Sequence, residues 1–248
     1  MIHLEGLVKA FGRFTAVDDV SLDVPEGEIH GFLGPNGAGK TTTIRMIAGL
    51  LQPTRGRVAI NGHDLAREPE AAKRALGFIP DRPFLYEKLT AAEFLRFHGG
   101  LYGLEGKGVE TRARELLDLF ELTDWRDELV ESFSHGMKQR LVMCAAFLHR
   151  PRAVVVDEPM VGLDPRGARL IKEIFRLQSE RSVAILMSTH TLEVAQEMCD
   201  RISIIQGGRI IARGTVEELR ELAGHDDAAL TPVFLKLTGG TGFQEVDL

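Results

Sequence analysis

The sequence predicts an α/β fold: a mostly parallel β-sheet flanked by helices, with an antiparallel β part at the N-terminus and an all-helical lobe inserted into the core. Three observations predict it. Residues 29–48 run from a short apolar stretch through a glycine-rich turn into a helical pattern. Strand-length apolar runs alternate with helical patterns over residues 153–205, as in a parallel sheet covered by helices. Between these parts, residues 90–150 keep the 3.6-residue period of helices.

Short apolar runs predict the strands. The first part of the chain alternates apolar and polar residues in the manner of β-strands and ends in a turn at residues 25–28. Further runs of strand length, bounded by glycine, proline or polar residues, lie at residues 29–33, 57–60, 76–79, 153–156, 183–188, 202–205 and 209–212.

Helical patterns fill the intervals between these strands. A helix starts near Lys40 and ends within residues 49–56, which hold a proline and two glycines. A capping box, Thr90 with Glu93, opens the helical part of the chain, and residues 112–122 carry an apolar stripe. Further helices are expected at residues 137–150, 166–179, 192–199 and 215–219.

The predicted organisation is one domain over residues 1–222 and a short C-terminal extension at residues 223–248. Within the domain, a helical lobe of about residues 88–150 is inserted into the α/β core. In the extension only residues 233–237 are apolar, and the last few residues are expected to be disordered.

Composition and charge limit the class of protein. The chain has 248 residues and is 44% hydrophobic, which suffices for a full core in one large domain, with or without an inserted lobe. The net charge of −6 argues against nucleic-acid binding through bulk charge, although a local basic patch is still open. Cys144 and Cys199 lack a Cys or His at metal-ligand spacing, so both are interpreted as reduced thiols of a cytosolic protein.

No stretch of the sequence predicts a membrane span or a secretion signal. No apolar run approaches the ~20 residues that a membrane-spanning helix needs. The N-terminal residues MIHLE have neither the basic start nor the apolar stretch of a signal peptide. We therefore expect a soluble protein that reaches a membrane only through a partner.

A phosphate-binding loop is the strongest motif. The pattern G-x-x-x-x-G-K-[ST] stands between an expected strand and an expected helix, the context that it requires for a P-loop NTPase core. Glycines let backbone N–H groups curl around a di- or triphosphate, and the helix dipole points its positive end at the same phosphates. Lys40 adds a charge for the β- and γ-phosphates, and the Thr41 hydroxyl suits Mg²⁺. The predicted nucleotide contacts here are Gly34, Pro35, Asn36, Gly37, Ala38, Gly39, Lys40, Thr41 and Thr42.

Two adjacent carboxylates follow the apolar run at residues 153–156. Ligands bind at the carboxyl ends of buried parallel strands, so Asp157 is expected beside the phosphate loop, holding Mg²⁺ directly or through water. Glu158, the next residue, is placed to act as general base on an attacking water. Alone, an Asp-Glu pair after a strand indicates only a solvated strand end; after a phosphate loop in the same sheet, it indicates catalysis.

The chain resembles the nucleotide-binding subunit of an ABC transporter over about residues 2–222. Beyond the phosphate loop and the Asp-Glu pair at Walker B, five further markers stand in family order. They are an adenine-stacking aromatic, the glutamine-loop position, the signature segment (residues 134–140, SHGMKQR), the D-loop at residues 162–164 and the switch histidine. The residues at the aromatic, glutamine-loop, signature and switch positions are Phe11, Asp81, Ser134, Gly136 and His190.

The resemblance implies roles for these residues. Phe11 would stack on adenine, although its neighbours also fit a core position. Ser134 and Gly136 would meet the γ-phosphate through a hydroxyl and a backbone N–H at a helix N-terminus. His190 would sense the γ-phosphate and, with Glu158, place the attacking water, whereas a lone histidine without these markers is more often structural.

Two positions depart from the family pattern. His135 stands where a small residue is usual, and we expect it to alter nucleotide affinity or pH response without abolishing function. Asp81 replaces the usual glutamine. Its carboxylate can ligate Mg²⁺ or a bound water, together with Thr41 and Asp157, but a role as a spacer beside Arg82 is a real alternative.

The resemblance also implies partners and place. ATP with Mg²⁺ would lie between two ATP-binding subunits, either two copies of this chain or a copy and a homologue, since the signature segment of one closes on the phosphate loop of the other. An integral-membrane permease would hold the pair on the inner face of the cell membrane. The residues Phe84, Leu85 and Tyr86 either line its docking groove or pack under the lobe. Most similar are subunits of ABC-2 type exporters, and no nucleic-acid partner is expected.

Two other classes compete with the transporter interpretation. A soluble ABC ATPase acting on ribosomes or nucleic acid usually carries tandem cassettes, a long coiled coil, zinc-binding cysteines or a basic arm, and the sequence has none of them. A generic phosphate-loop kinase or GTPase gives no reason for the signature segment or for His190.

Overall fold

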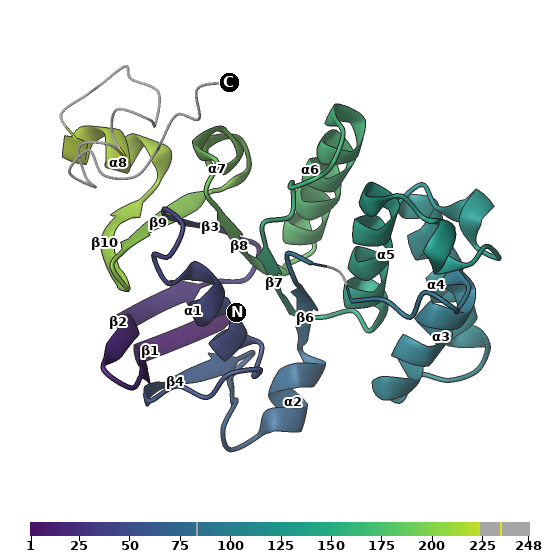
Figure 1. The fold of residues 1–248 in the computed structure, drawn as a ribbon, viewed down its shortest axis with the longest axis horizontal. Coiled ribbons are helices and arrows are strands. Elements are labelled where there is room, and N and C mark those ends of the chain that lie inside the picture. Colours follow the sequence, from purple (N-terminus) through teal and green to yellow (C-terminus); the bar gives the residue numbers. More distant parts are fainter. Residues whose placement is uncertain (83, 224–233, 235–248) are drawn as a thin grey trace.

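The computed structural model describes residues 1–82, 84–223 and 234 of the chain (Figure 1). The apolar stretch predicted at residues 233–237 and the C-terminal extension therefore lie outside the described residues, except for the end of the last helix and Phe234. Phe234 is fully buried and belongs to the main hydrophobic cluster.

A six-stranded sheet forms the centre of the molecule, in the order β10-β9-β3-β8-β7-β6. Five neighbouring strands run parallel, and only β10 pairs antiparallel, with β9. The predicted mostly parallel sheet is confirmed. Its strands are β3 (Ile29–Leu33), β6 (Leu76–Ile79), β7 (Ala153–Asp157), β8 (Ala184–Thr189), β9 (Arg201–Gln206) and β10 (Arg209–Gly214).

The N-terminal β part is a second, antiparallel sheet in the order β2-β1-β4-β5. Asn61 and Gly62 both have positive φ, as a tight turn between β4 and β5 requires. The sequence patterns missed the two-residue strand β5 and the short helix α2 (Pro69–Arg74), which buries only Ala72 and so has no apolar stripe. The strands are β1 (Ile2–Phe11), β2 (Phe14–Val24), β4 (Arg55–Ile60) and β5 (His63–Asp64).

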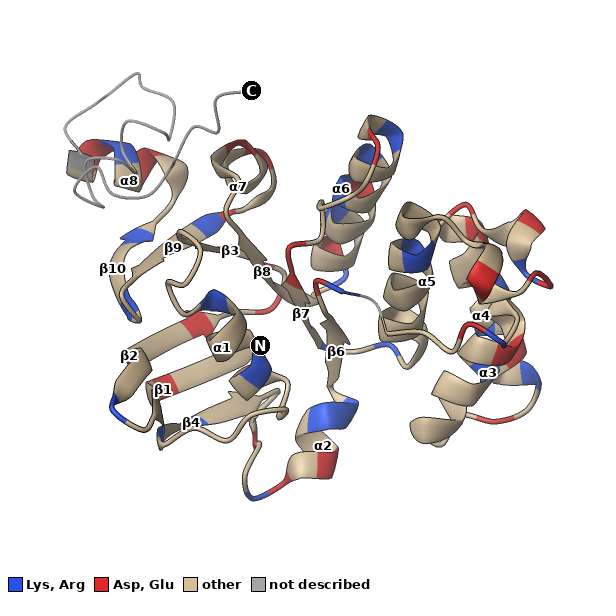
Figure 2. Cartoon of the chain, in the orientation of Figure 1, with Lys and Arg blue, Asp and Glu red and all other residues tan. Residues whose placement is uncertain are grey.

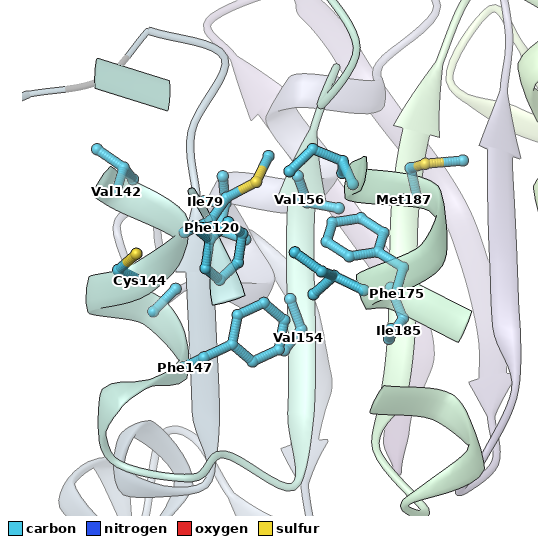
Figure 3. Packing of buried hydrophobic residues seen from close by; sticks show 14 of the residues in the cluster. Ile79, Phe120, Val142, Cys144, Phe147, Val154, Val156, Phe175, Ile185 and Met187 are labelled. Atoms are coloured by element: carbon cyan, nitrogen blue, oxygen red, sulfur yellow. The ribbon is translucent and has the colours of Figure 1, made fainter. Parts of the chain in front are cut away.

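Two hydrophobic clusters lie on opposite faces of the central sheet, because successive strand residues point to opposite sides. Ala153 and Val155 pack on α1 and the small sheet, whereas Val154 and Val156 pack on the helices of the other face. Figure 3 shows Val154 and Val156 of β7 between Phe147 of α5 and Phe175 of α6. The helices of the core are α1 (Lys40–Ile47), α6 (Pro165–Glu180), α7 (Leu192–Met198) and α8 (Val216–Ala223).

The helical lobe lies beside β6, between β6 and β7 in the chain (Figure 1). It holds α3 (Ala91–Leu101), α4 (Lys107–Leu119), two short 3₁₀ helices and α5 (His135–Leu148). The predicted capping box of Thr90 with Glu93 is present. The helix expected at residues 137–150 instead starts at His135, because Ser134 is its N-cap and accepts a hydrogen bond from the Met137 N–H. The helix expected from residue 112 starts five residues earlier, at Lys107.

Both cysteines are free and buried, and burial raises the pKa of each thiol. The expectation of reduced thiols agrees with this geometry. None of the helices in the described ranges combines the length and the apolar character that a membrane span requires. Acidic and basic residues are interspersed over the elements that Figure 2 shows.

Candidate functional site

The phosphate loop connects β3 to α1 at the carboxyl end of the parallel strands. A Cβ added to Gly34 would collide with the carbonyl oxygen of Ile205. Gly39, the N-cap of α1, has φ of 108°, and a Cβ there would approach the Ala16 carbonyl oxygen to 2.6 Å. Only glycine fits both positions. The loop is thereby pressed against β2 and β9, with Asn36 and Gly37 left exposed at its tip.

Lys40 is the first residue of α1 and is only 6% exposed. Its ammonium group donates hydrogen bonds to the carbonyl oxygens of Gly34, at 2.6 Å, and Pro35, at 3.2 Å. Burial lowers the pKa of Lys40, and the carboxylates of Glu158 and Asp157 raise it. The cation is thus held inside the loop and faces the two carboxylates across it.

Strand register brings the Walker B carboxylates to this loop. Leu33 pairs with Thr189 and Asp157 pairs with Ser188, so the residues that follow β3, β7 and β8 leave the sheet at one edge. Asp157 is 3% exposed and accepts a hydrogen bond from the Ser188 hydroxyl. Ser188 is a residue of the site that the sequence interpretation missed. Its position as a polar residue at the carboxyl end of a buried strand was the available signal.

Glu158 turns away from the line of β7. Its φ of 52° is a left-handed value, which is uncommon outside glycine, and its backbone N–H donates to the Ser188 carbonyl oxygen at 3.2 Å. The turn brings Oε1 of Glu158 to 2.9 Å from Nδ1 of His190. The Glu158 side chain is 15% exposed and that of His190 is 44% exposed, so the pair is open to solvent on the histidine side.

Asp81 and Asp157 line one hollow of about 390 Å³, together with Arg45, Phe78 and Arg82. The two carboxylates that were predicted as metal ligands therefore face the same space, although Asp81 itself is exposed. Arg45 and Arg82 are further charged groups of this hollow that the sequence interpretation did not assign to the site.

The residues at this edge suit a nucleotide bound with Mg²⁺. The glycine cradle leaves no room for side chains, and a buried cation points into it, as the phosphates of a nucleotide require. In the described ranges, no three His, Cys, Asp or Glu residues gather as a metal site of their own. A Thr41 hydroxyl with one or two carboxylates is instead the protein's usual share of a Mg²⁺ site that phosphate oxygens and water complete.

Phe11 lies at the end of β1, directly opposite Phe14 across the hairpin. Its ring is 50% exposed, and the Lys9 ammonium lies 5.2 Å from the ring centroid. Core packing, the alternative left open by the sequence, does not describe an aromatic side chain this exposed. The exposed ring is free to stack on a base.

The signature residues lie apart from this edge, at the N-terminus of α5. Ser134 is exposed, and its hydroxyl caps the helix at 3.3 Å from the Met137 N–H. His135 packs on the D-loop: a Cβ on Gly162 would lie 2.5 Å from Cδ2 of the His135 ring. Gly136 lies in the first helical turn, next to Leu163 of the same loop.

The structure thus divides the predicted residues into two groups. Residues of the phosphate loop, Walker B, the glutamine-loop position and the switch histidine gather at one edge of the central sheet. Within the described residues, Ser134 and Gly136 make no hydrogen bond or ion pair with that group. They share a surface with the D-loop, whose Asp164 caps α6 by accepting a hydrogen bond from the Gly167 N–H at 2.7 Å.

Residues 17–161 match the family described as ABC transporter. Among curated relatives, the linearmycin resistance ATP-binding protein LnrL of Bacillus subtilis is 39% identical over 91% of this chain and 73% of its own length. The daunorubicin/doxorubicin resistance ATP-binding protein DrrA of Streptomyces peucetius is 40% identical over 90% and 68%. EcsA, an ABC-type transporter ATP-binding protein of Bacillus subtilis, is 37% identical over 96% of both chains.

Solved structures match the fold closely. The ATP-binding subunit of an ABC transporter superposes with a TM-score of 0.90 and 37% identity, covering 96% of this chain and 99% of that chain. A dimeric cassette in a post-hydrolysis state with ADP and Pi, MJ0796, superposes with a TM-score of 0.79 and 25% identity, covering 87% and 98%.

Proposed function

The chain belongs to the ABC transporter family as an ATP-binding, ATP-hydrolysing subunit, and we propose that it drives an exporter through two unlike half-sites on its surface. One observation carries the proposal: Lys40, Asp157, Glu158 and His190 converge at one sheet edge, while Ser134 is exposed elsewhere. A second ATP-binding subunit supplies the missing half of each site.

Each residue of the first half-site has a task that its environment supports. The phosphate loop and Lys40 bind the nucleotide phosphates, and Phe11 stacks on the adenine. Thr41, Asp157 and Asp81 hold Mg²⁺, which supplies charge neutralisation at the phosphates when it is bound. Glu158 accepts the proton of the attacking water, and His190, 2.9 Å away, fixes the orientation of that carboxylate.

The second half-site acts on the nucleotide of the other subunit. The Ser134 hydroxyl and the first N–H groups of α5 approach the γ-phosphate when the two subunits close. Without a second subunit, the exposed position of Ser134 leaves its hydroxyl in water. ATP-dependent closure and hydrolysis-dependent opening then form the two-state element that does mechanical work.

Three neighbouring exposed aromatic rings support the proposal of a permease partner. Phe84 is 81% exposed, and its ring lies 6.0 Å from that of Tyr86, which in turn lies 5.2 Å from Phe97 of α3. Leu85, between Phe84 and Tyr86, instead packs against the hydrophobic core. Contiguous exposed rings at the junction of lobe and core suit a short helix of a membrane subunit.

The relatives also support the proposals of export and of a location at the membrane. Two of the relatives named above are resistance ATP-binding proteins, and the third is an ABC-type transporter ATP-binding protein, which favours efflux over a soluble ATPase of ribosomes or nucleic acid. The subunit then sits on the cytoplasmic face of the membrane, held there by its permease.

Affinity purification of the tagged chain from gently solubilised native cells tests the proposal. We expect a polytopic membrane protein at a stoichiometric ratio, and its loss when Phe84 and Tyr86 are both replaced by Ser. A pair of exposed residues elsewhere, Leu222→Ser with Ile211→Ser, serves as the matched control. Recovery of ribosomal or nucleic-acid-binding proteins in place of a membrane protein would contradict the transporter role.

A further inference from the structure

The end of α5 opposite Ser134 is closed by two stacked rings. His149 is the C-cap of α5, and Tyr102 is the C-cap of α3. Their ring centroids lie 3.8 Å apart, and their planes differ by 10°. Nε2 of His149 also lies 3.1 Å from the carbonyl oxygen of Leu76, the first residue of β6. One imidazole therefore joins two helices of the lobe to the central sheet.

The hydrogen bond fixes the state of the ring. A carbonyl oxygen only accepts, so Nε2 of His149 carries the proton of the neutral imidazole and donates it to Leu76. Nδ1 is then a bare acceptor, and it is buried without a partner in the described part of the chain. Burial lowers the pKa of His149 to about 4, so the ring stays neutral at physiological pH. The neutral ring therefore offers a flat face for stacking and one N–H donor.

Close backbone packing locks the same end of α5. A Cβ on Gly77 of β6 would lie 2.8 Å from the Ala146 carbonyl oxygen. A Cβ on Gly99 of α3 would lie 2.6 Å from Val109 and 3.3 Å from Leu148, the last residue of α5. The Gly77 contact is with backbone, so glycine lets β6 approach the end of α5 closely. The Gly99 contacts are with the side chains of Val109 and Leu148, which pack against the backbone of α3.

The opposite end of α5 is held by side-chain contacts: His135 packs on Gly162, and Lys138 donates a hydrogen bond to Glu87 at 2.6 Å. A Cβ on Gly136 would lie 3.5 Å from Leu163, an ordinary contact distance, and Ser134 is exposed. The 14 residues of α5 span about 21 Å at about 1.5 Å per residue, so a tilt of about 5° at the His149 end moves Ser134 by about 2 Å. A misplacement of about 1 Å can lower a catalysed rate by about 10²-fold.

We propose that His149 and Tyr102 are positioning residues for Ser134: their stack and the hydrogen bond to Leu76 set the angle of α5, and with it the point at which Ser134 meets the nucleotide of a second subunit. Neither residue touches that nucleotide. The proposal rests on the signature role stated above.

The test measures ATP-dependent dimer formation of the full chain by sedimentation, in a Glu158→Gln background that keeps ATP bound. His149→Phe keeps an aromatic ring and removes the N–H donor. His149→Gln keeps an N–H near the Nε2 position and removes the ring. Tyr102→Leu removes the ring on which His149 stacks. Tyr102→Phe keeps the stack. His63→Gln changes a partly exposed histidine of β5, far from α5 in the fold, and is the matched control.

We expect each of the first three variants to raise the ATP concentration at half-dimerisation about tenfold, with ADP affinity of the monomer within about twofold of the parent. In the Glu158 chain, the same variants lower kcat and leave nucleotide affinity unchanged. Tyr102→Phe and His63→Gln behave as the parent. If the two His149 variants fail to fold, Tyr102→Leu alone decides.

Two results overturn the proposal: dimerisation at the parent ATP concentration, or loss of monomer ADP binding in parallel with dimerisation, which indicates a general structural role. Ser134→Ala separates this failure from that of the signature role. If Ser134→Ala dimerises like the parent, the signature role itself is wrong. If it weakens dimerisation and the His149 and Tyr102 variants do not, only the positioning role is wrong.

Discussion

The phosphate loop and the signature segment each stand at the N-terminus of a helix, but the lysine of the first is buried and the serine of the second lies open on the surface. Lys40 is 6% exposed and is bonded to two carbonyl oxygens of its own loop, whereas Ser134 is exposed and bonded only to its own helix. The phosphate loop is also backed by strands β3, β7 and β8, while the first turn of the signature helix contacts two surface segments, the D-loop and, through Lys138, Glu87.

This difference indicates a division of labour. Groups that are desolvated and fixed in advance can bind a charged ligand without a further ordering cost. Such groups lie at the phosphate loop, so one chain is able to hold a nucleotide by itself. The N-terminus of the signature helix lies in water, where the helix dipole attracts an anion only weakly. The attraction becomes stronger when a second subunit excludes that water.

The largest expected effect is at Glu158, beside the phosphate loop. Glu158→Gln removes the proposed general base and should lower kcat by about 10²- to 10⁴-fold while ATP binding is kept and an ATP-bound dimer accumulates. Steady-state ATPase assays and sedimentation with ATP measure the two properties. Glu193→Gln, in the first turn of α7, is the matched control. A Glu158→Gln chain that hydrolyses ATP at the parent rate would show that another group takes the proton.

The next effect tests whether the phosphate loop binds on its own. Lys40→Ala deletes a buried cation that makes charge-assisted hydrogen bonds, and we expect nucleotide affinity of the monomer to fall by about 10- to 100-fold. Titration calorimetry with ATP measures it, with Lys73→Ala, an exposed lysine of α2, as control. Unchanged binding would remove the distinction between the two regions.

Substitution in the signature segment should affect dimerisation and not nucleotide binding by the monomer. Ser134→Ala is expected to leave monomer affinity within about twofold and to weaken ATP-dependent dimerisation about tenfold, the size of one hydrogen bond to a charged group. Because Ser134 is also the N-cap, Ser134→Asn keeps the cap and separates stability from phosphate contact. If Ser134→Ala weakened monomer binding instead, each chain would contain a complete site.

A pH effect is expected at the far end of the signature helix. The pKa of His149 is lowered from 6.5 to about 4, so between these values the unfolded chain binds the proton and the folded chain does not. Folding stability is therefore kept above pH 6.5 and falls as pH decreases toward 4, by about 1–2 kcal/mol between pH 7 and pH 5. Urea unfolding at both pH values, for the parent and His149→Gln, measures the difference. Equal losses in the two chains would assign the effect to other groups.

The smallest expected effect is at Asp81, which lines the hollow beside the phosphate loop together with Asp157. Asp81→Gln restores the residue usual in the family, keeps an oxygen ligand facing the hollow it shares with Asp157, and should change ATPase kcat by no more than about twofold. Transport in reconstituted vesicles is measured alongside. Loss of transport with ATPase activity kept would make position 81 a coupling residue rather than a metal ligand.

The sequence by itself determined the features that depend on local chemistry. The spacing of glycines before Lys40 requires a tight turn between strand and helix, and the apolar run before Asp157 requires a buried strand that ends in carboxylates. Both are present, as is the capping box at Thr90, because a few neighbouring residues satisfy each of them without help from the rest of the chain.

Other features needed contacts between distant residues, and only the tertiary structure decided them. Tyr102 stacks on His149, and Ser188 holds Asp157, because separate helices or strands pack together. The start of α5 at His135 was within reach of the sequence, since a serine is a preferred N-cap. The sequence could not show which of Phe84, Leu85 and Tyr86 is buried. A short apolar run carries no period, and its burial depends on the surface against which it packs.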